Sequence, residues 1–501
     1  MHPKTQAGQR LFLLSLGLAL GSGILVLLWP GPTVAVFTAF TGAVFNLATP
    51  LFLLSVSGFL VLCLALAISP VGRRRLGPQD ARPEFSTLSW LSMLFAAGMG
   101  TGLVVWGVAE PMTHMLKPPS DGSEGAVELA FLITHFHWGL HAWAIYGVGA
   151  LVLAYFGFTK GTPYLPGAPI RSGFTGAWTG PVAWAADLLA VLAVTFGVAG
   201  SIGMGVMQLA SGLTAVAGAP ADSVGIDAGI LLVLFAAYML SAATGLDKGI
   251  KILSNLNMVL AIGLVFVLLF LGPTSTLLSA LVTNLGDYLV SVPALSVQTR
   301  PFGGSADWVQ GWTLVYFVWW IAWTPFVGIF IARISRGRTI REFVVGVLVC
   351  PTLFSIFWFT VLGGVAVAQQ TGGSQDYSAL LSTDVTGVLY QVLETSSGGP
   401  LLGGLATLVL FVFMVTSVDS ATFVLGMLTS GGDLEPSRSR KLSWGIALAV
   451  MGGSFALVGD VETIKVLTIA GAIPFLLVLI LQVVAFLRSL RSDVKAEKAA
   501  R

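Results

Sequence analysis

The sequence carries little charge and almost no cysteine. Of its 501 residues, 10% are Asp, Glu, Lys or Arg and 55% are hydrophobic, with a mean hydropathy of +0.89. So apolar a composition excludes a soluble globular protein, and a disordered chain is excluded because charges are too few and aromatic residues too many. The formal net charge of +2, with no basic run longer than Arg73–Arg75, excludes a nucleic-acid partner. Cys63 and Cys350 both lie in apolar runs, which excludes a disulfide framework and a thiolate metal site.

What the sequence has instead is long apolar runs. A membrane-spanning helix needs about 20 mostly apolar residues. On that basis we predict an all-α polytopic membrane protein with twelve spans, approximately at 11–30, 47–69, 88–115, 126–156, 182–214, 225–243, 251–272, 309–333, 342–368, 398–430, 441–459 and 463–488. The first run lacks the cleavage pattern of a secretory signal, so we expect it to be retained. Residues 273–308 are expected to form a periplasmic connection that has room for a surface helix.

The positions of the basic residues predict the orientation of these spans. If both termini are cytoplasmic, all Lys and Arg except Lys117, Arg300 and Lys465 fall on the inner side, as the positive-inside rule requires. Residues 1–10 and 489–501 are then short cytoplasmic tails. The C-terminal tail is basic, and we expect it to lie at the anionic inner surface of the membrane.

The third span contains three glycines at alternate positions, Gly98, Gly100 and Gly102. Each glycine costs roughly 1 kcal/mol in a helix interior relative to alanine. Close packing against another helix is one explanation, but a spacing of two residues does not keep glycines on one helix face. An unwound stretch, with carbonyls free for a cation or a substrate, fits better, because irregular backbone at that depth must line an enclosed cavity.

Two spans carry clusters of aromatic residues. At 100° per residue, Trp138, Trp143 and Tyr146 fall within an arc of roughly 140°, and the tryptophans at 319, 320 and 323 fall within about 100° on another span. An interfacial aromatic belt is the alternative, but both clusters lie several residues inside their spans. Converging indoles at that depth favour a cation–π cage for a methylated ammonium group, with an attraction of about 2 kcal/mol or more once desolvated.

Few ionisable groups lie within the predicted spans. Glu110 and Asp419 are near span ends, where carboxylates more often cap or pair than bind a ligand. His137 and His141 have the spacing of two metal ligands on one helix face. No carboxylate or cysteine in the adjacent sequence completes such a site, so we expect hydrogen-bonded core histidines rather than a metal centre or a membrane enzyme.

Three segments of the sequence resemble the betaine/choline/carnitine transporter family. They are GMGTGL at 98–103 with AEP at 109–111, HWGLHAWAIY at 137–146, and WWIAWTPF at 319–326 continuing to IARISRGR at 331–338. The resemblance implies a LeuT-type core of two inverted five-helix repeats, 87–272 and 309–488, preceded by two peripheral helices within 11–86. It also implies a homotrimer in the bacterial inner membrane, surrounded by lipid.

The resemblance also implies a set of site residues. The family's aromatic box corresponds to Trp138, Trp143, Tyr146 and Trp320, with Trp323 on the cytoplasmic part of the path and Gly98, Met99, Gly100 and Gly102 as the unwound stretch. The family's sodium site corresponds to carbonyls of Ala96, Met99 and Phe413 and to hydroxyls of Thr416 and Ser417. These neutral oxygens suit a hard monovalent cation.

The function implied by the resemblance is sodium-coupled import of glycine betaine, or of a related methylated or zwitterionic solute, by alternating access. No catalysis and no organic cofactor are expected. A choline, carnitine, ectoine or dimethylsulfoniopropionate carrier is the alternative, as is an ion-independent exchanger. Exchangers of the family have an arginine in the seventh span, but residues 255–258 at that place in this chain are Asn-Leu-Asn-Met. Proton-coupled choline carriers of the family have Asp in place of Gly102. A second sodium is in doubt because Val194 and Val198 stand where some betaine symporters have threonine.

Overall fold

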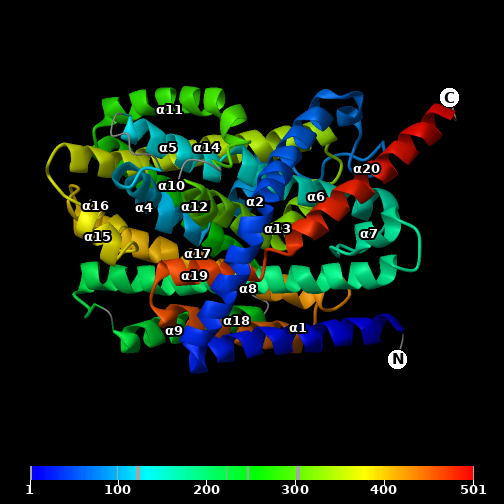
Figure 1. The fold of residues 1–501 in the computed structure, drawn as a ribbon, viewed down its shortest axis with the longest axis horizontal. Helices are drawn as coiled ribbons and strands as arrows, with labels where there is room; N and C mark the ends of the chain where they lie inside the picture. The colour runs from blue at the N-terminus through cyan, green and yellow to red at the C-terminus, as the bar shows by residue number, and fades with distance from the viewer. Residues whose placement is uncertain are drawn as a thin grey trace.

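The described chain is helical throughout, as predicted. The computed structural model describes residues 3–98, 100–119, 125–221, 223–244, 247–300 and 305–499, and gives no side-chain surroundings at 3–7, 95–98, 243–244 and 247–251. Within these ranges one isolated antiparallel bridge, between Arg75 and Thr339, stands outside the helices. The helices, shown in Figure 1, are α1 Pro3–Leu28, α2 Pro30–Ile68, η1 Pro70–Arg73, α3 Thr87–Gly98, α4 Thr101–Leu116, α5 Ala126–Trp138, α6 Leu140–Lys160, α7 Ala168–Gly173, α8 Thr179–Ala217, α9 Val224–Thr244, α10 Asp247–Leu271, α11 Thr274–Leu295, α12 Ala306–Val309, η2 Gln310–Leu314, α13 Val315–Ile334, α14 Ile340–Thr371, α15 Ser378–Thr383, α16 Val388–Glu394, α17 Gly399–Leu428, α18 Arg438–Val458, α19 Val461–Ala470 and α20 Phe475–Ala499.

Twelve helices of the described chain are long and apolar enough to cross a membrane, which confirms the predicted number. They are not the same twelve. The predicted span 88–115 is divided into the two shorter helices α3 and α4, and α11 reaches the required length and hydropathy instead. α11 packs against α5 and α14.

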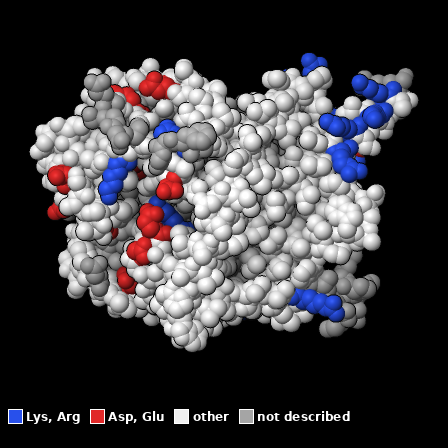
Figure 2. All heavy atoms as spheres, viewed as in Figure 1, with Lys and Arg blue, Asp and Glu red and all other residues white. Residues whose placement is uncertain are grey.

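Charged residues gather at the two ends of the helix bundle. Figure 2 shows an uncharged band between them, with Asp and Glu prominent at the end near α15 and α16 and Lys and Arg at the opposite end. Both chain termini and α7 lie at this basic end (Figure 1). An apolar band between two charged ends is the surface that a bilayer requires, since its hydrocarbon core solvates no charge.

Several of the membrane-length segments are interrupted near the middle of the molecule. α3 ends at Gly98 and α4 begins at Thr101, with Gly100 fully extended (φ −153°, ψ −169°). α5 and α6 are separated at Gly139, where a Cβ atom would collide with the hydroxyl of Tyr288. That hydroxyl accepts a 2.7 Å hydrogen bond from the free backbone N–H of Leu140. A break in a buried helix therefore acquires a partner from α11.

The last turns of the C-terminal helix α20 are held against the protein by acidic residues. The carboxylate of Asp493 accepts hydrogen bonds from Tyr155 Oη and Lys160 Nζ, both at 2.6 Å, and Glu497 forms an ion pair with Arg74. From the sequence we expected the basic residues of this tail to hold it at the membrane surface. The structure adds contacts with the end of α6 and with Arg74, directly after η1, on the same chain.

Removing these contacts should release the tail. We expect the double variant Asp493→Asn, Glu497→Gln to lose its C-terminal peptide to trypsin about fivefold faster, because two partly exposed ion pairs of roughly 0.5 kcal/mol each are lost. Mass spectrometry of the detergent-solubilised protein would follow cleavage at Lys495 and Lys498. The control, Asp433→Asn with Glu435→Gln, changes charge equally at exposed positions. Equal cleavage rates in both variants would show that the acidic residues do not hold the tail.

Candidate functional site

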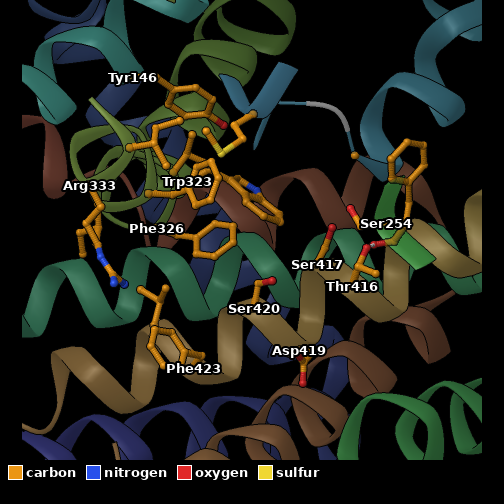
Figure 3. Close-up of a pocket in the computed structure, with 18 of the residues that line it drawn as sticks. Tyr146, Ser254, Trp323, Phe326, Arg333, Thr416, Ser417, Asp419, Ser420 and Phe423 are labelled. Carbon is orange, nitrogen blue, oxygen red and sulfur yellow. Dashed lines mark hydrogen bonds between the residues drawn. The ribbon is translucent and has the colours of Figure 1, made fainter. Parts of the chain in front are cut away.

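A cavity of about 900 Å³ lies within the bundle, and Arg333 and Arg336 are among the residues that line it. Helices α4, α5, α6, α8, α13 and α17 contribute to its walls (Figure 3). Its aromatic lining residues are Trp106, Trp138, Tyr146, Phe158, Tyr164, Tyr316, Trp319, Trp320, Trp323, Phe326, Phe330, Phe413 and Phe423, with Phe85 near the opening. Such a cavity, mostly apolar with a few polar groups, is the usual form of a small-molecule site.

Three aromatic side chains predicted for the cage line this cavity together. The rings of Trp138 and Trp320 meet edge to face with centroids 5.4 Å apart, and Tyr146 lies 5.0 Å from Trp320. Trp323 lines the cavity farther along α13. Trp143, by contrast, is 1% exposed and packs behind Tyr146 and Trp320, at 5.7 and 6.1 Å, without lining the cavity.

A buried carboxylate holds the indole of Trp138. Glu110 is fully buried within α4, six residues before its end and not at the span end expected from the sequence. Its Oε2 accepts a 2.6 Å hydrogen bond from Trp138 Nε1, and its Oε1 lies 2.7 Å from His137 Nδ1. His137 Nε2 lies 3.0 Å from Thr313 Oγ1, and the carbonyl of His137 accepts a 3.0 Å bond from Trp320 Nε1. One network therefore orients both facing indoles of the cavity.

The two histidines singled out in the sequence do not face a common site. His141 Nε2 lies 3.0 Å from Ser296 Oγ and 3.4 Å from Ser57 Oγ, whereas His137 pairs with Glu110. Sequence reasoning missed this pairing because 27 residues separate His137 from the carboxylate. The only early signal was the presence of a carboxylate within an otherwise apolar span.

The glycine stretch adjoins the cage. Gly100 and Gly102 line the cavity, and a Cβ atom at Gly102 would lie 3.1 Å from Trp138 Cη2, so any larger residue would press on that ring. Gly98 is the last residue of α3. Met99 lies outside the described residues, and so do the side-chain surroundings of Ala96 and Gly98.

Hydroxyl groups of α17 form another part of the cavity wall. Phe413, Thr416 and Ser417 line the cavity, and Figure 3 shows Thr416, Ser417 and Ser420 side by side on α17 while Asp419 points away from them. Thr416 Oγ1 donates to the carbonyl of Val412 at 2.9 Å and keeps lone pairs for another ligand. Two hydroxyls and neighbouring carbonyls are neutral oxygen ligands, which fit a sodium ion.

The cavity has an open end and a closed end. Arg333, Arg336 and Glu84 line the open end, with Arg336 and Glu84 paired at 3.1 Å and half-exposed. At the other end Lys465, 2% exposed, lies 4.0 Å from the ring centre of Trp312 and 4.7 Å from that of Trp106. A tethered ammonium between two indoles therefore stands behind the cage on the side away from the opening.

Comparison with known proteins finds transporters that are similar to this chain over most of its length. The family model described as betaine/carnitine/choline family transporter matches residues 10–495. The glycine betaine transporter OpuD of Bacillus subtilis (strain 168) is 41% identical over 90% of this chain and 88% of its own length. The ectoine/hydroxyectoine transporter of Virgibacillus pantothenticus is 37% identical over 89% of each. Among solved structures, MhsT in complex with L-phenylalanine matches with a TM-score of 0.44 and 15% identity, covering 79% of this chain and 89% of its own.

The Glu110 network generates a prediction about stability. Glu110→Ala leaves the N–H groups of Trp138 and His137 without an acceptor, so we expect about 3 kcal/mol or more of lost stability. A lower midpoint of thermal unfolding in detergent would measure it. Glu128→Ala is the control, because Glu128 is exposed at the start of the adjacent helix α5 and should shift the midpoint little. Equal midpoints in the two variants would contradict the structural role of Glu110.

Proposed function

The chain belongs to the betaine/carnitine/choline transporter family, and we propose that it imports glycine betaine, coupled to sodium, by alternating access. It is a transporter and not an enzyme. We further propose a homotrimer in a bacterial inner membrane, with both termini cytoplasmic. The clustering of basic residues and of both termini at one end of the bundle supports that orientation.

The observation that supports the substrate is that Trp138, Tyr146 and Trp320 lie together on the wall of a cavity of about 900 Å³. A quaternary ammonium cannot accept or donate hydrogen bonds, so aromatic faces are the groups that can bind it selectively. The indole N–H groups of Trp138 and Trp320 are already occupied by Glu110 and the carbonyl of His137, which leaves the ring faces for the cation.

The proposed sodium ligands are the carbonyls of Ala96, Met99 and Phe413 and the hydroxyls of Thr416 and Ser417. The position of the last three on the cavity wall supports this. Asn257, near the place of the exchangers' arginine, is neutral and donates to the carbonyl of Val409 at 3.1 Å. Val194 and Val198 are buried and offer no hydroxyl, so we propose one sodium ion rather than two.

Alternating access is supported by the unequal ends of the cavity. The end rimmed by Arg333 and Arg336 is open, whereas Lys465 and its two indoles close the opposite end. With the basic end cytoplasmic, this conformation faces inward. Solute loading from outside requires the Lys465 end to open while the arginine end closes, and the sodium ion would favour the state in which both ligands bind.

An ectoine carrier is the second candidate, because a relative of 37% identity is named an ectoine/hydroxyectoine transporter. Choline, carnitine and dimethylsulfoniopropionate carriers would use the same aromatic cage. Uptake of each labelled solute into proteoliposomes, with and without a sodium gradient, separates these functions. Saturable betaine uptake that stops without sodium supports our proposal, and equal uptake without sodium supports the exchanger.

Trp320 tests the cage directly. Trp320→Leu removes one desolvated cation–π face of about 2 kcal/mol, so we expect betaine affinity to fall about 30-fold. Binding to purified protein measures the change, with thermal unfolding as a check on the fold. The control is Trp29→Leu, since Trp29 is 56% exposed between α1 and α2. A Trp320→Leu variant with wild-type affinity would remove this residue from the site.

Thr416 and Ser417 test the coupling ion. The double variant Thr416→Ala, Ser417→Ala loses both side-chain ligands, so we expect a higher sodium concentration for half-maximal uptake. Thr407→Ala, on the same helix and hydrogen-bonded within it to Gly403, is the matched control. Should both variants need the same sodium concentration as the wild type, the ion binds elsewhere.

A further inference from the structure

A second polar site lies behind the cage wall, formed by one carboxylate and two imidazoles. Glu110 and His114 are one turn apart on α4, and His137 faces them from α5. All three side chains are fully buried, and one ligand atom from each lies within 4.8 Å of the others. Glu110 Oε1 is 2.7 Å from His137 Nδ1 and 3.4 Å from His114 Nε2.

His114 is the unexplained member of this cluster. Its Nε2 lies 3.4 Å from Glu110 Oε1, and its Nδ1 makes no hydrogen bond within the described part of the chain. The ring instead packs against Trp312, with centroids 4.5 Å apart, and against Trp308 at 5.4 Å. A buried polar group without a partner costs roughly 1–3 kcal/mol. A buried imidazole with a nitrogen free of hydrogen bonds, next to a carboxylate and a second imidazole, is placed as a metal ligand would be.

The other two side chains are held by a second layer of contacts. Trp138 Nε1 occupies Oε2 of Glu110 and leaves Oε1 for the centre of the cluster. Thr313 Oγ1 lies 3.0 Å from the remaining nitrogen of His137. Metal-binding carboxylates and histidines are characteristically oriented by outer partners of this kind.

We propose that Glu110, His114 and His137 bind a divalent transition-metal ion, with Zn²⁺ the best match. Two histidines and one glutamate, with a fourth position left for water, are an established zinc ligand set. Zinc lies about 2.0–2.2 Å from such ligands, so two of them are at most about 4.4 Å apart. The separations of Glu110 Oε1 from His137 Nδ1 and from His114 Nε2, 2.7 and 3.4 Å, satisfy this limit. Binding moves the proton of His137 from Nδ1 to Nε2, which then donates to Thr313.

The nearby cation Lys465 does not prevent this binding. Its ammonium is paired with Glu462 at 2.8 Å and lies over Trp312, so its charge is balanced outside the cluster. The cluster is fully buried in the present conformation. A metal ion therefore reaches it only when the Lys465 end of the cavity opens.

A consequence follows for transport, and it depends on the proposed function. The metal adds positive charge directly behind Trp138, one wall of the cage for a cationic headgroup. It also links α4 to α5 across the region that must move. Zn²⁺ should therefore weaken betaine binding and slow uptake.

Direct metal binding tests the site without reference to transport. Calorimetry with Zn²⁺ on tag-free, chelator-treated protein in detergent should give one ion per chain. Co²⁺ at the same site should give the visible absorption bands of a low-coordinate ion. His114→Gln should weaken binding by at least the roughly 10- to 100-fold that losing even an outer partner costs, and should abolish the bands. His141→Gln, a buried histidine bonded to Ser296, is the matched control and should bind as the wild type does.

Two further outcomes keep the test decisive. If His114→Gln does not fold, Thr313→Val removes only the outer partner of His137 and should weaken Zn²⁺ binding roughly tenfold. Absence of stoichiometric Zn²⁺ in the wild type, or equal binding by His114→Gln, overturns the site. Zn²⁺ should lower betaine affinity in the wild type and not in His114→Gln. A protein that binds Zn²⁺ at this site but binds no betaine would overturn the proposed substrate and leave the metal site standing.

Discussion

The buried carboxylate of Glu110 is the interaction on which the arrangement of the cavity depends. One of its oxygens accepts a hydrogen bond from the indole of Trp138, and the other pairs with the imidazole of His137. The carbonyl of His137 in turn accepts a hydrogen bond from the indole of Trp320. Helices α4, α5 and α13 are thereby joined through one charge. A carboxylate taken out of water is tolerated only when its lone pairs are satisfied. The same requirement fixes the directions in which the ring faces point.

Broken helices supply part of the cavity wall and lie close to it. A membrane helix can interrupt its hydrogen bonds only where protein or an enclosed cavity covers the free groups. The break at Gly100 lies on the cavity wall, and the break at Gly139 is covered by the hydroxyl of Tyr288. The last segment is interrupted between α19 and α20. These interruptions are places where a helix can bend, and the break at Gly100 puts one of them on the cavity wall.

Positively charged groups have different surroundings at different points along the cavity. Arginines rim the open end, where water and Glu84 balance them. The cage in the middle offers ring faces, and the closed end holds the ammonium of Lys465 between two indoles. The chain thus already uses cation–π contacts to keep one of its own cations out of water. A solute with a trimethylammonium head would be bound by the same physical means.

Much of this protein was determined by the sequence alone, because the bilayer imposes a length and a polarity on every span. The number of membrane-length helices and the glycine break follow from local patterns. The lining positions of Trp320 and Trp323 follow as well, since α13 is continuous through both tryptophans. The relative directions of the Trp138 and Trp143 side chains were not predicted correctly. The helix breaks at Gly139 between them, so a regular turn of 100° per residue no longer relates the two positions. Trp143 consequently packs behind the cage. The contacts of Glu110 with residues 27 and 28 positions away, and the burial of Lys465 against Trp312, were decided only by tertiary structure, because no local periodicity relates groups on separate helices.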